Sequence, residues 1–182
     1  MKMDWADIRQ VAALVSQHLH SHQVTATLVG GACVSIYSRN EYQSSDLDLV
    51  TDSSLKKLAK VLAGIGFERQ AKGGKLFARQ GCDFILDFVP PPIAIGNEPV
   101  DPVRGVKVIE TELGHLRLLT PTDCVKDRLA AYYHWNDPQS LEQALMVARA
   151  QAADIDLKNV ERWSRRENHL EKFRTFLERL GQ

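Results

Sequence analysis

The sequence predicts an α+β protein in which a mixed β-sheet with flanking helices is followed by a C-terminal helical bundle. Two observations support this fold class. Short strand-like runs alternate with helical stripes in the first part of the chain, and from Thr120 onward the apolar period is helical throughout. Strand and helix patterns that mix in this way are typical of a sheet covered by helices. We therefore divide the chain into a core of residues 1–119 and a bundle of residues 120–182.

An amphipathic helix opens the chain, because apolar residues recur at spacings of three and four: Trp5, Ile8, Ala12, Val15 and Leu19. A short buried strand is expected at residues 25–29. Gly30 and Gly31 then separate this strand from a second helix that begins at Ala32.

The segment Asp46–Thr51 alternates polar and apolar residues, which predicts a strand with Leu47 and Leu49 facing the core. A third helix is expected from about Ser54. Further strands are expected at residues 67–80, as a hairpin turning at Gly73 and Gly74, and at residues 83–89, 106–109 and 116–119.

The bundle is expected to begin with a capped helix, since Thr120 is a suitable N-cap and Pro121 suits the first helical position. Asp137 and Pro138 repeat this arrangement one helix later. Apolar stripes mark the remaining helices, so the bundle should hold about four.

Composition and charge limit the classes of function. The chain has 182 residues, of which 44% are apolar and 25% are charged, as in an ordinary globular protein. Lys plus Arg and Asp plus Glu both number 23, so the formal net charge is zero. Contact with a nucleic acid would therefore need a local basic patch.

The chain has neither an apolar stretch long enough to span a bilayer nor the apolar core of a signal peptide. We expect a cytoplasmic protein with no membrane partner. Cys33, Cys82 and Cys124 are odd in number and lack the paired spacing of zinc or redox sites, so we expect all three to be buried small hydrophobes.

The most informative pair of residues is Asp46 and Asp48. Residues two apart on a strand project from the same face, so the two carboxylates should lie side by side. A hard divalent cation such as Mg²⁺ removes their mutual repulsion by taking both as oxygen ligands. Beside a triphosphate, such an ion polarises the phosphoryl oxygens and neutralises the leaving pyrophosphate. The alternative is the solvent face of an edge strand, because Asp-x-Asp is a common tripeptide.

The Gly30-Gly31 pair lies between a strand and a helix. Bare backbone at this point lets a phosphate approach the unpaired N–H groups of the helix start. A plain chain reversal would also need glycine.

Together these segments resemble the nucleotidyltransferase superfamily, whose motif is Gly-Gly or Gly-Ser at a helix start followed by Asp-x-Asp on the next strand. The stretches Gly30–Tyr37 and Ser44–Leu49, with Arg39 between them, look most similar to the minimal bacterial branch, which includes the abortive-infection toxins of toxin–antitoxin pairs. The resemblance covers the first half of the chain well and the second half loosely. Those toxins carry a downstream acidic string that this chain lacks.

The resemblance implies a catalytic core in residues 1–119 that uses Mg²⁺ or Mn²⁺. The implied reaction moves a nucleoside monophosphate from an NTP such as ATP to an acceptor hydroxyl on RNA, on protein or on a small molecule. An antitoxin would be a partner if the protein is a toxin. A nucleotide-binding or regulatory module without turnover is the alternative.

The superfamily also implies a third carboxylate on a later strand, for which Asp83 and Asp87 are candidates. We favour Asp87, because it lies deeper among core residues, where an unpaired charge is costly. Asp83 is explained as a strand-entry residue, and a structural salt bridge is the alternative for Asp87. The expected catalytic and metal-binding residues are thus Asp46, Asp48 and Asp87.

The expected nucleotide-binding residues are Gly30, Gly31, Ser44 and Lys126. The superfamily often places a lysine or arginine at the position of Lys126 to face the phosphates, although a solvated helix face explains it equally well. Ser44 could instead form a local turn. The hairpin tip at residues 72–75 has two lysines that could contact an acceptor, or it is a plain solvated turn.

Overall fold

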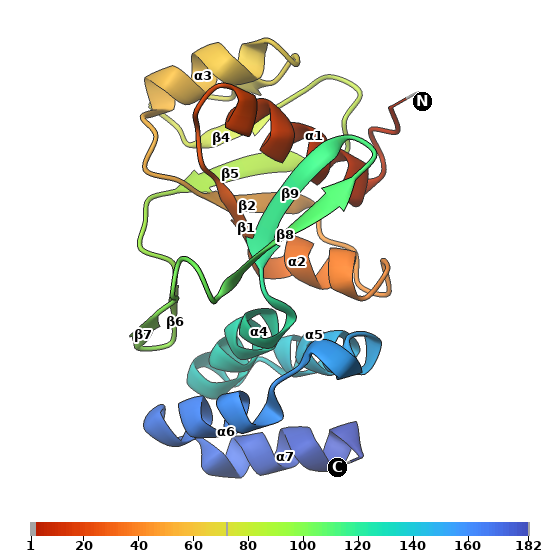
Figure 1. The fold of residues 1–182 in the computed structure, drawn as a ribbon, viewed down its shortest axis with the longest axis vertical. Coiled ribbons are helices and arrows are strands. Elements are labelled where there is room, and N and C mark those ends of the chain that lie inside the picture. The colour runs from red at the N-terminus through yellow and green to blue at the C-terminus, as the bar shows by residue number, and fades with distance from the viewer. Residues whose placement is uncertain (1–2, 72, 182) are drawn as a thin grey trace.

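The protein consists of a sheet covered by helices and, beyond it, a group of further helices (Figure 1). This computed structural model describes residues 3–71 and 73–181. Lys72, in the expected basic hairpin tip, lies outside the described residues. The sheet-containing part lies at one end of the long axis, and α4 to α7 lie at the other.

The first part contains three helices: α1 (Ile8–Ser21), α2 (Gly30–Tyr37) and α3 (Leu55–Ala63). Its strands are β1 (Thr27–Val29), β2 (Asp46–Val50), β3 (Glu68–Arg69), β4 (Leu76–Ala78), β5 (Ile85–Val89), β6 (Ala94–Ile95), β7 (Glu98–Pro99), β8 (Val106–Thr111) and β9 (Gly114–Leu119). The second part contains α4 (Pro121–Trp135), α5 (Pro138–Ala150), a 3-10 turn η1 (Ala152–Asp154), α6 (Leu157–Arg166) and α7 (Leu170–Leu180).

Seven strands form one mixed sheet in the order β3-β4-β5-β2-β1-β9-β8. The strand pairs β2–β5 and β1–β9 are parallel, and the other neighbours are antiparallel. This topology confirms the predicted mixed sheet with flanking helices, including the hairpin formed by β3 and β4.

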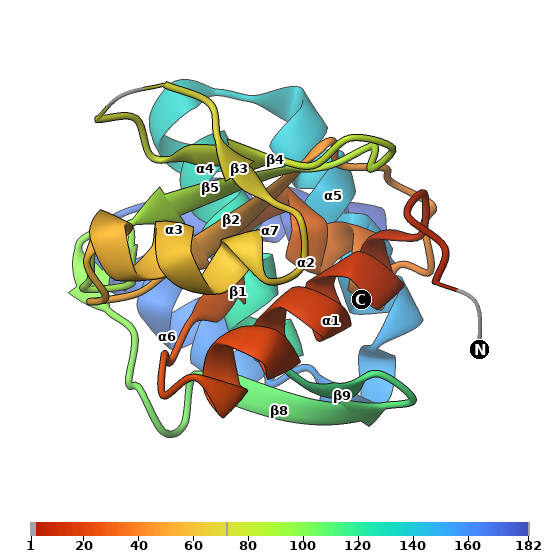
Figure 2. The same ribbon diagram turned by 90° about the horizontal axis from the view of Figure 1, so that it is seen from above.

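Helices cover the sheet as the apolar stripes predict. Helices α1 and α3 lie together over the sheet (Figure 2). Helix α2 contacts β2 and also packs against α4 and α5, so it joins the sheet to the C-terminal helices. The C-terminal part consists of helices, as predicted.

Local capping explains where the C-terminal helices begin. The Thr120 hydroxyl accepts a hydrogen bond from the Asp123 amide at 3.1 Å, and Pro121 occupies the first turn of α4. The carboxylate of Asp137 accepts from the Gln139 amide at the start of α5. Both caps are confirmed.

Several boundaries differ from the prediction. Helix α2 begins at Gly30 rather than at Ala32, and α1 begins at Ile8, after an Asp7 cap, so Trp5 precedes it. Cys33 and Cys124 are buried as expected. The prediction for Cys82 was wrong: it is only partly buried, because it lies in the chain reversal that precedes β5.

None of the helices in the described part of the chain combines the length and the apolar character that crossing a bilayer requires.

Candidate active site

The parallel pairing of β2 with β5 brings the acidic residues together. The register sets Asp48 directly opposite Asp87, and Asp46 opposite Ile85. Neighbouring strands lie about 4.8 Å apart, and residues two apart share a face. Asp46, Asp48 and Asp87 therefore lie on one face of the sheet, next to one another. Asp83 precedes β5 and is exposed.

The electrostatic environment of Asp48 disfavours its charge. Burial is the largest cause that raises the pKa of this carboxyl above its ordinary value, and the charges of Asp87 and Asp46 raise it further. The Arg128 guanidinium lowers the pKa of Asp48, but by less. An added cation would relieve the same repulsion that raises this pKa.

Gly30 allows the Asp48 carboxylate to lie against the start of α2. Gly30 has a φ of +68°, and a Cβ built on it would lie 2.5 Å from Oδ2 of Asp48. A Cβ on the neighbouring Gly31 would lie 3.2 Å from Oγ of Ser44. The glycine pair thus brings the start of α2 beside the acidic strand, and a helix N-terminus favours anions.

Ser44 fixes the entry into β2. Its hydroxyl donates to the carbonyl of Asp46 at 2.9 Å, and its backbone amide donates to Oγ of Ser35 at 2.9 Å. The Asp46 amide in turn donates to Ser44 Oγ at 3.3 Å. These bonds make Ser44 a local support of the acidic strand.

The Asp87 carboxylate is only half satisfied. Lys75, which follows the β3–β4 turn, places its Nζ 3.0 Å from Oδ2 of Asp87. The other oxygen, Oδ1, is buried and has no hydrogen-bond partner within residues 3–71 and 73–181. The salt bridge considered as the alternative for Asp87 therefore exists, yet it leaves one carboxylate oxygen free.

The donor set fits a hard divalent cation. Magnesium prefers carboxylate oxygens, and the unpartnered Oδ1 of Asp87 together with the crowded carboxylate of Asp48 offers such atoms on one face. Nowhere in residues 3–71 and 73–181 do three acidic, histidine or cysteine side chains already converge as a metal site would require. The carboxylates thus lie next to one another without forming a closed cluster.

Helix α4 contributes two basic side chains near the site, Lys126 and Arg128, and each pairs with an acidic residue of the same helix. Lys126 pairs with Asp123 at 2.9 Å, and both side chains are largely buried. Arg128 pairs with Asp127, donating from Nε at 3.0 Å, and its charge acts on Asp48. Sequence reasoning missed Arg128 because two residues along a helix turn the side chain to another face.

A cleft of about 570 Å³ lies between the β6–β7 hairpin and α4. Asp127 and Arg128 line it, as do His134 and the indole of Trp135, which is 80% exposed. The remaining lining residues are small or polar: Ala94, Gly96, Asn97, Ala130 and Ala131.

Glu167, from the end of α6, fixes the hairpin wall of this cleft. Its buried carboxylate accepts hydrogen bonds from the backbone amide and from Nδ2 of Asn97, each at 2.9 Å. It also lies 3.1 Å from Nε2 of His134 on α4. One side chain of the C-terminal helices thus joins the hairpin to α4.

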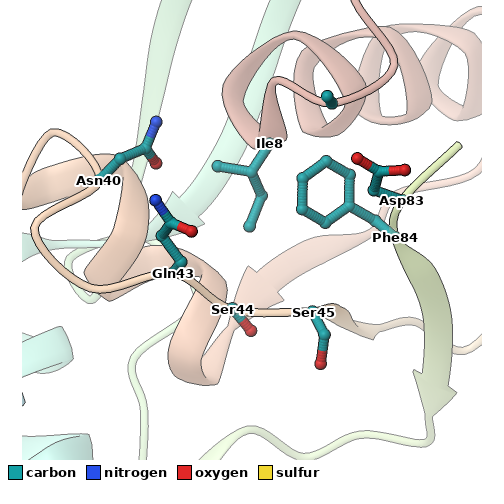
Figure 3. Close-up of a pocket in the computed structure, with 8 residues that line it drawn as sticks. Ile8, Asn40, Gln43, Ser44, Ser45, Asp83 and Phe84 are labelled. Atoms are coloured by element: carbon teal, nitrogen blue, oxygen red, sulfur yellow. The ribbon is translucent and has the colours of Figure 1, made fainter.

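A second cavity, of about 320 Å³, lies at the entry to β2 and β5 (Figure 3). Asn40 and Gln43 form one side of it, Asp83 and Phe84 form the other, and Ile8 lies between them. Asp83 therefore belongs to this cavity, whereas Asp87 lies opposite Asp48.

The raised pKa of Asp48 predicts a pH-dependent response to cations. Protonated Asp48 favours the fold below its ordinary pKa of about 4, and this contribution is lost as the pH rises through the raised folded pKa. Mg²⁺ competes with the proton, so its stabilising effect should grow over the same window. At about ten times its Kd, the ion should add about 1.4 kcal/mol, or about 3–6 °C in Tm.

The measurement is a series of thermal melts between about pH 4 and pH 8, with and without Mg²⁺. The Asp48→Asn variant should lack the pH-dependent part of the cation effect. An equal cation effect at every pH would contradict this interpretation of Asp48.

Comparison with known proteins agrees with the observed topology. No protein-family model matches the chain, and no curated protein matches it. A solved antigenic nucleotidyltransferase-like protein from Paracoccidioides brasiliensis superposes with a TM-score of 0.57 at 15% identity, over 78% of this chain and 75% of that one. ANT(2")-Ia in complex with adenylyl-2"-tobramycin superposes with a TM-score of 0.55 at 13% identity, over 92% and 97%. The chain therefore has the fold of the nucleotidyltransferase-like proteins, with a helical C-terminal part.

Proposed function

We propose that this protein is a metal-dependent nucleotidyltransferase that moves a nucleoside monophosphate from an NTP to an acceptor hydroxyl. The observation that carries the proposal is the placement of Asp48 opposite Asp87 on parallel strands, with the Gly30 helix start against the Asp48 carboxylate. A fold shared with nucleotidyltransferase-like proteins supports it.

In this mechanism the protein mainly positions the reactants. Asp46, Asp48 and Asp87 would hold Mg²⁺ or Mn²⁺, which polarises the phosphoryl oxygens when bound. The N–H groups at the start of α2, from Gly30 and Gly31, would receive the triphosphate. Preorganised donors and charges of this kind stabilise the transition state without having to reorganise.

The transfer itself exchanges a phosphoanhydride bond of the NTP for a phosphoester bond to the acceptor. The acceptor oxygen forms a bond to the α-phosphorus, the bond to the bridging oxygen breaks, and pyrophosphate leaves. Asp87 would orient the acceptor hydroxyl and take its proton. Ser44 and Lys126 remain proposed nucleotide-binding residues, and Arg128 joins them because its charge already acts on Asp48.

We further propose that the acceptor is a small hydroxylated molecule bound in the cleft between α4 and the β6–β7 hairpin. The volume of about 570 Å³ suits such a ligand, and Arg128 connects this cleft electrostatically to Asp48. ANT(2")-Ia, which has this fold, was solved with adenylyl-2"-tobramycin. Residues 1–119 would then supply the chemistry, and residues 120–182 would supply one wall of the acceptor site.

The direct test is pyrophosphate release by the purified protein with Mg²⁺, ATP or another NTP, and a panel of hydroxylated small molecules and tRNA. Transfer should add one NMP to a small acceptor, as seen by mass spectrometry, and EDTA should stop it. Nucleotide binding by calorimetry without any release would favour a binding module. Neither binding nor release would contradict the proposed function.

Trp135 offers a test of the acceptor site. Replacing it by alanine removes a flat apolar surface from the cleft, so the KM for the acceptor should rise about two- to tenfold with the KM for the NTP unchanged. Labelling of tRNA alone, unaffected by Trp135→Ala, would argue for an RNA acceptor bound elsewhere.

A further inference from the structure

Lys75 lies where a cation beside Asp87 would lie. The backbone of Lys75 is fixed next to β5, since its carbonyl accepts a hydrogen bond from the Phe88 amide at 3.2 Å. The following residue, Leu76, pairs with Asp87 in the register of β4 and β5. From this position the side chain reaches back to Oδ2 of Asp87 at 3.0 Å.

This ammonium group neutralises only part of the acidic face. Among the described residues, Oδ1 of Asp87 is buried and has no hydrogen-bond partner, and Asp48 lies directly opposite Asp87 across the strand pair. A monovalent lysine contacts one oxygen, whereas a divalent ion can take oxygens from several carboxylates at once. With Lys75 in place, the negative charge of the acidic face formed by Asp46, Asp48 and Asp87 is therefore only partly neutralised.

The Lys75–Asp87 pair is also easy to separate. The Lys75 side chain is 51% exposed and that of Asp87 is 21% exposed. The lysine end of the pair is thus open to solvent, and pairs that solvent reaches change an equilibrium by only about one- to fivefold. A buried pair would resist separation much more strongly.

We propose that the ammonium group of Lys75 occupies the position of the metal ion at Asp87. When the ion binds, Lys75 leaves Asp87 and binds the triphosphate instead. Without a metal, Lys75 holds the third carboxylate. When Mg²⁺ takes Asp87, the ammonium is released beside the site at which the NTP phosphates would lie, and it binds them. This inference rests on the proposed function, because it needs both the ion and the triphosphate.

Replacing Lys75 by methionine keeps most of the length of the side chain and removes its charge. The affinities for the metal ion and for the nucleotide should then change in opposite directions. Without nucleotide, Mn²⁺ should bind about two- to fivefold more tightly to Lys75→Met than to the wild type, as measured by electron paramagnetic resonance or calorimetry. With Mn²⁺ present, a non-hydrolysable NTP analogue should bind about two- to fivefold more weakly. Lys75→Arg, which keeps the charge, should restore analogue binding.

Lys107→Met is the matched control. Lys107 pairs with Asp154 at the same distance of 3.0 Å, and its side chain is 42% exposed, close to that of Lys75. It lies on β8, at the other edge of the sheet from β3 and β4. Its loss should change neither affinity. Thermal melts of both variants show whether they fold, and Lys75→Gln serves as a second variant if Lys75→Met does not.

The outcomes separate this inference from the proposed function. If the wild type binds Mn²⁺ and Lys75→Met binds it equally well, Lys75 is a structural salt bridge and the inference is wrong, while the proposed function stands. If Lys75→Met binds both Mn²⁺ and the analogue more tightly, the handover to phosphate is wrong. If the wild type binds no Mn²⁺, both the inference and the metal-dependent function fail.

Discussion

Replacing Asp48 by asparagine is expected to lower the rate of nucleotidyl transfer about a thousandfold or more. The substitution removes a carboxylate that would bind the cation, and cations of this kind stabilise a transition state by several kcal/mol. A loss of about 4 kcal/mol corresponds to about a thousandfold in rate. The measurement is kcat/KM from pyrophosphate release at saturating Mg²⁺.

The same variant should fold at least as well as the wild type in metal-free buffer. Burial and the neighbouring acids disfavour the charge of Asp48, so removing that charge relieves repulsion. Asp83→Asn is the matched control, because Asp83 is an exposed carboxylate that precedes β5 and is not paired with Asp48 in the strand register. Its rate should stay within about twofold of wild type, as for a substitution that breaks no transition-state contact. A large loss in Asp83→Asn together with normal transfer in Asp87→Asn would reassign the third carboxylate.

Gly30→Ala is expected to cost both stability and activity. Its φ of +68° is unfavourable for alanine by about 1–2 kcal/mol, which lowers Tm by about 2–8 °C in a protein of this size. The new Cβ would also meet Oδ2 of Asp48 at 2.5 Å and displace that carboxylate. Displacements of about 1 Å at a catalytic group can cost about a hundredfold in rate.

Gly81→Ala distinguishes the effect of backbone strain at a positive φ from the effect of the contact between the new Cβ and Asp48. Gly81 has a similar φ of +75°, but nothing lies within 4 Å of an added Cβ. It should lose a comparable amount of stability, by thermal melting, with transfer nearly unchanged. Equal rates for the two variants would show that the close approach of Gly30 to Asp48 does not matter for catalysis.

Much of the fold was predictable because the spacing of apolar residues in each helix or strand is visible within one short segment of sequence. The alternation of Asp46 to Leu49 predicted β2 and the face of its acids, and Thr120-Pro121 predicted the start of α4. The β6–β7 hairpin was not predicted, since strands of two residues show no period. Its position depends instead on contacts with Glu167, far away in the sequence.

The candidate site was predictable only in part. The expected burial of Asp87 among core residues favoured it over Asp83, and the register of β2 with β5 sets Asp87 opposite Asp48. Strand register depends on pairing across the sheet, which a local pattern does not contain. The contact of Lys75 with Asp87 and the effect of Arg128 on the pKa of Asp48 also depend on tertiary structure. Neither has a signal in the nearby sequence.

The hydrogen bonds between Glu167 and the β6–β7 hairpin determine which segments could be transplanted between proteins of this fold. The hairpin precedes the helical region in the chain, but its tip is anchored by a carboxylate near the end of α6. Grafting residues 120–182 alone onto another core would leave that buried carboxylate without its amide donors, at a cost of about 1–3 kcal/mol. A transferable unit would therefore comprise two separate stretches of sequence, the hairpin and the helices together.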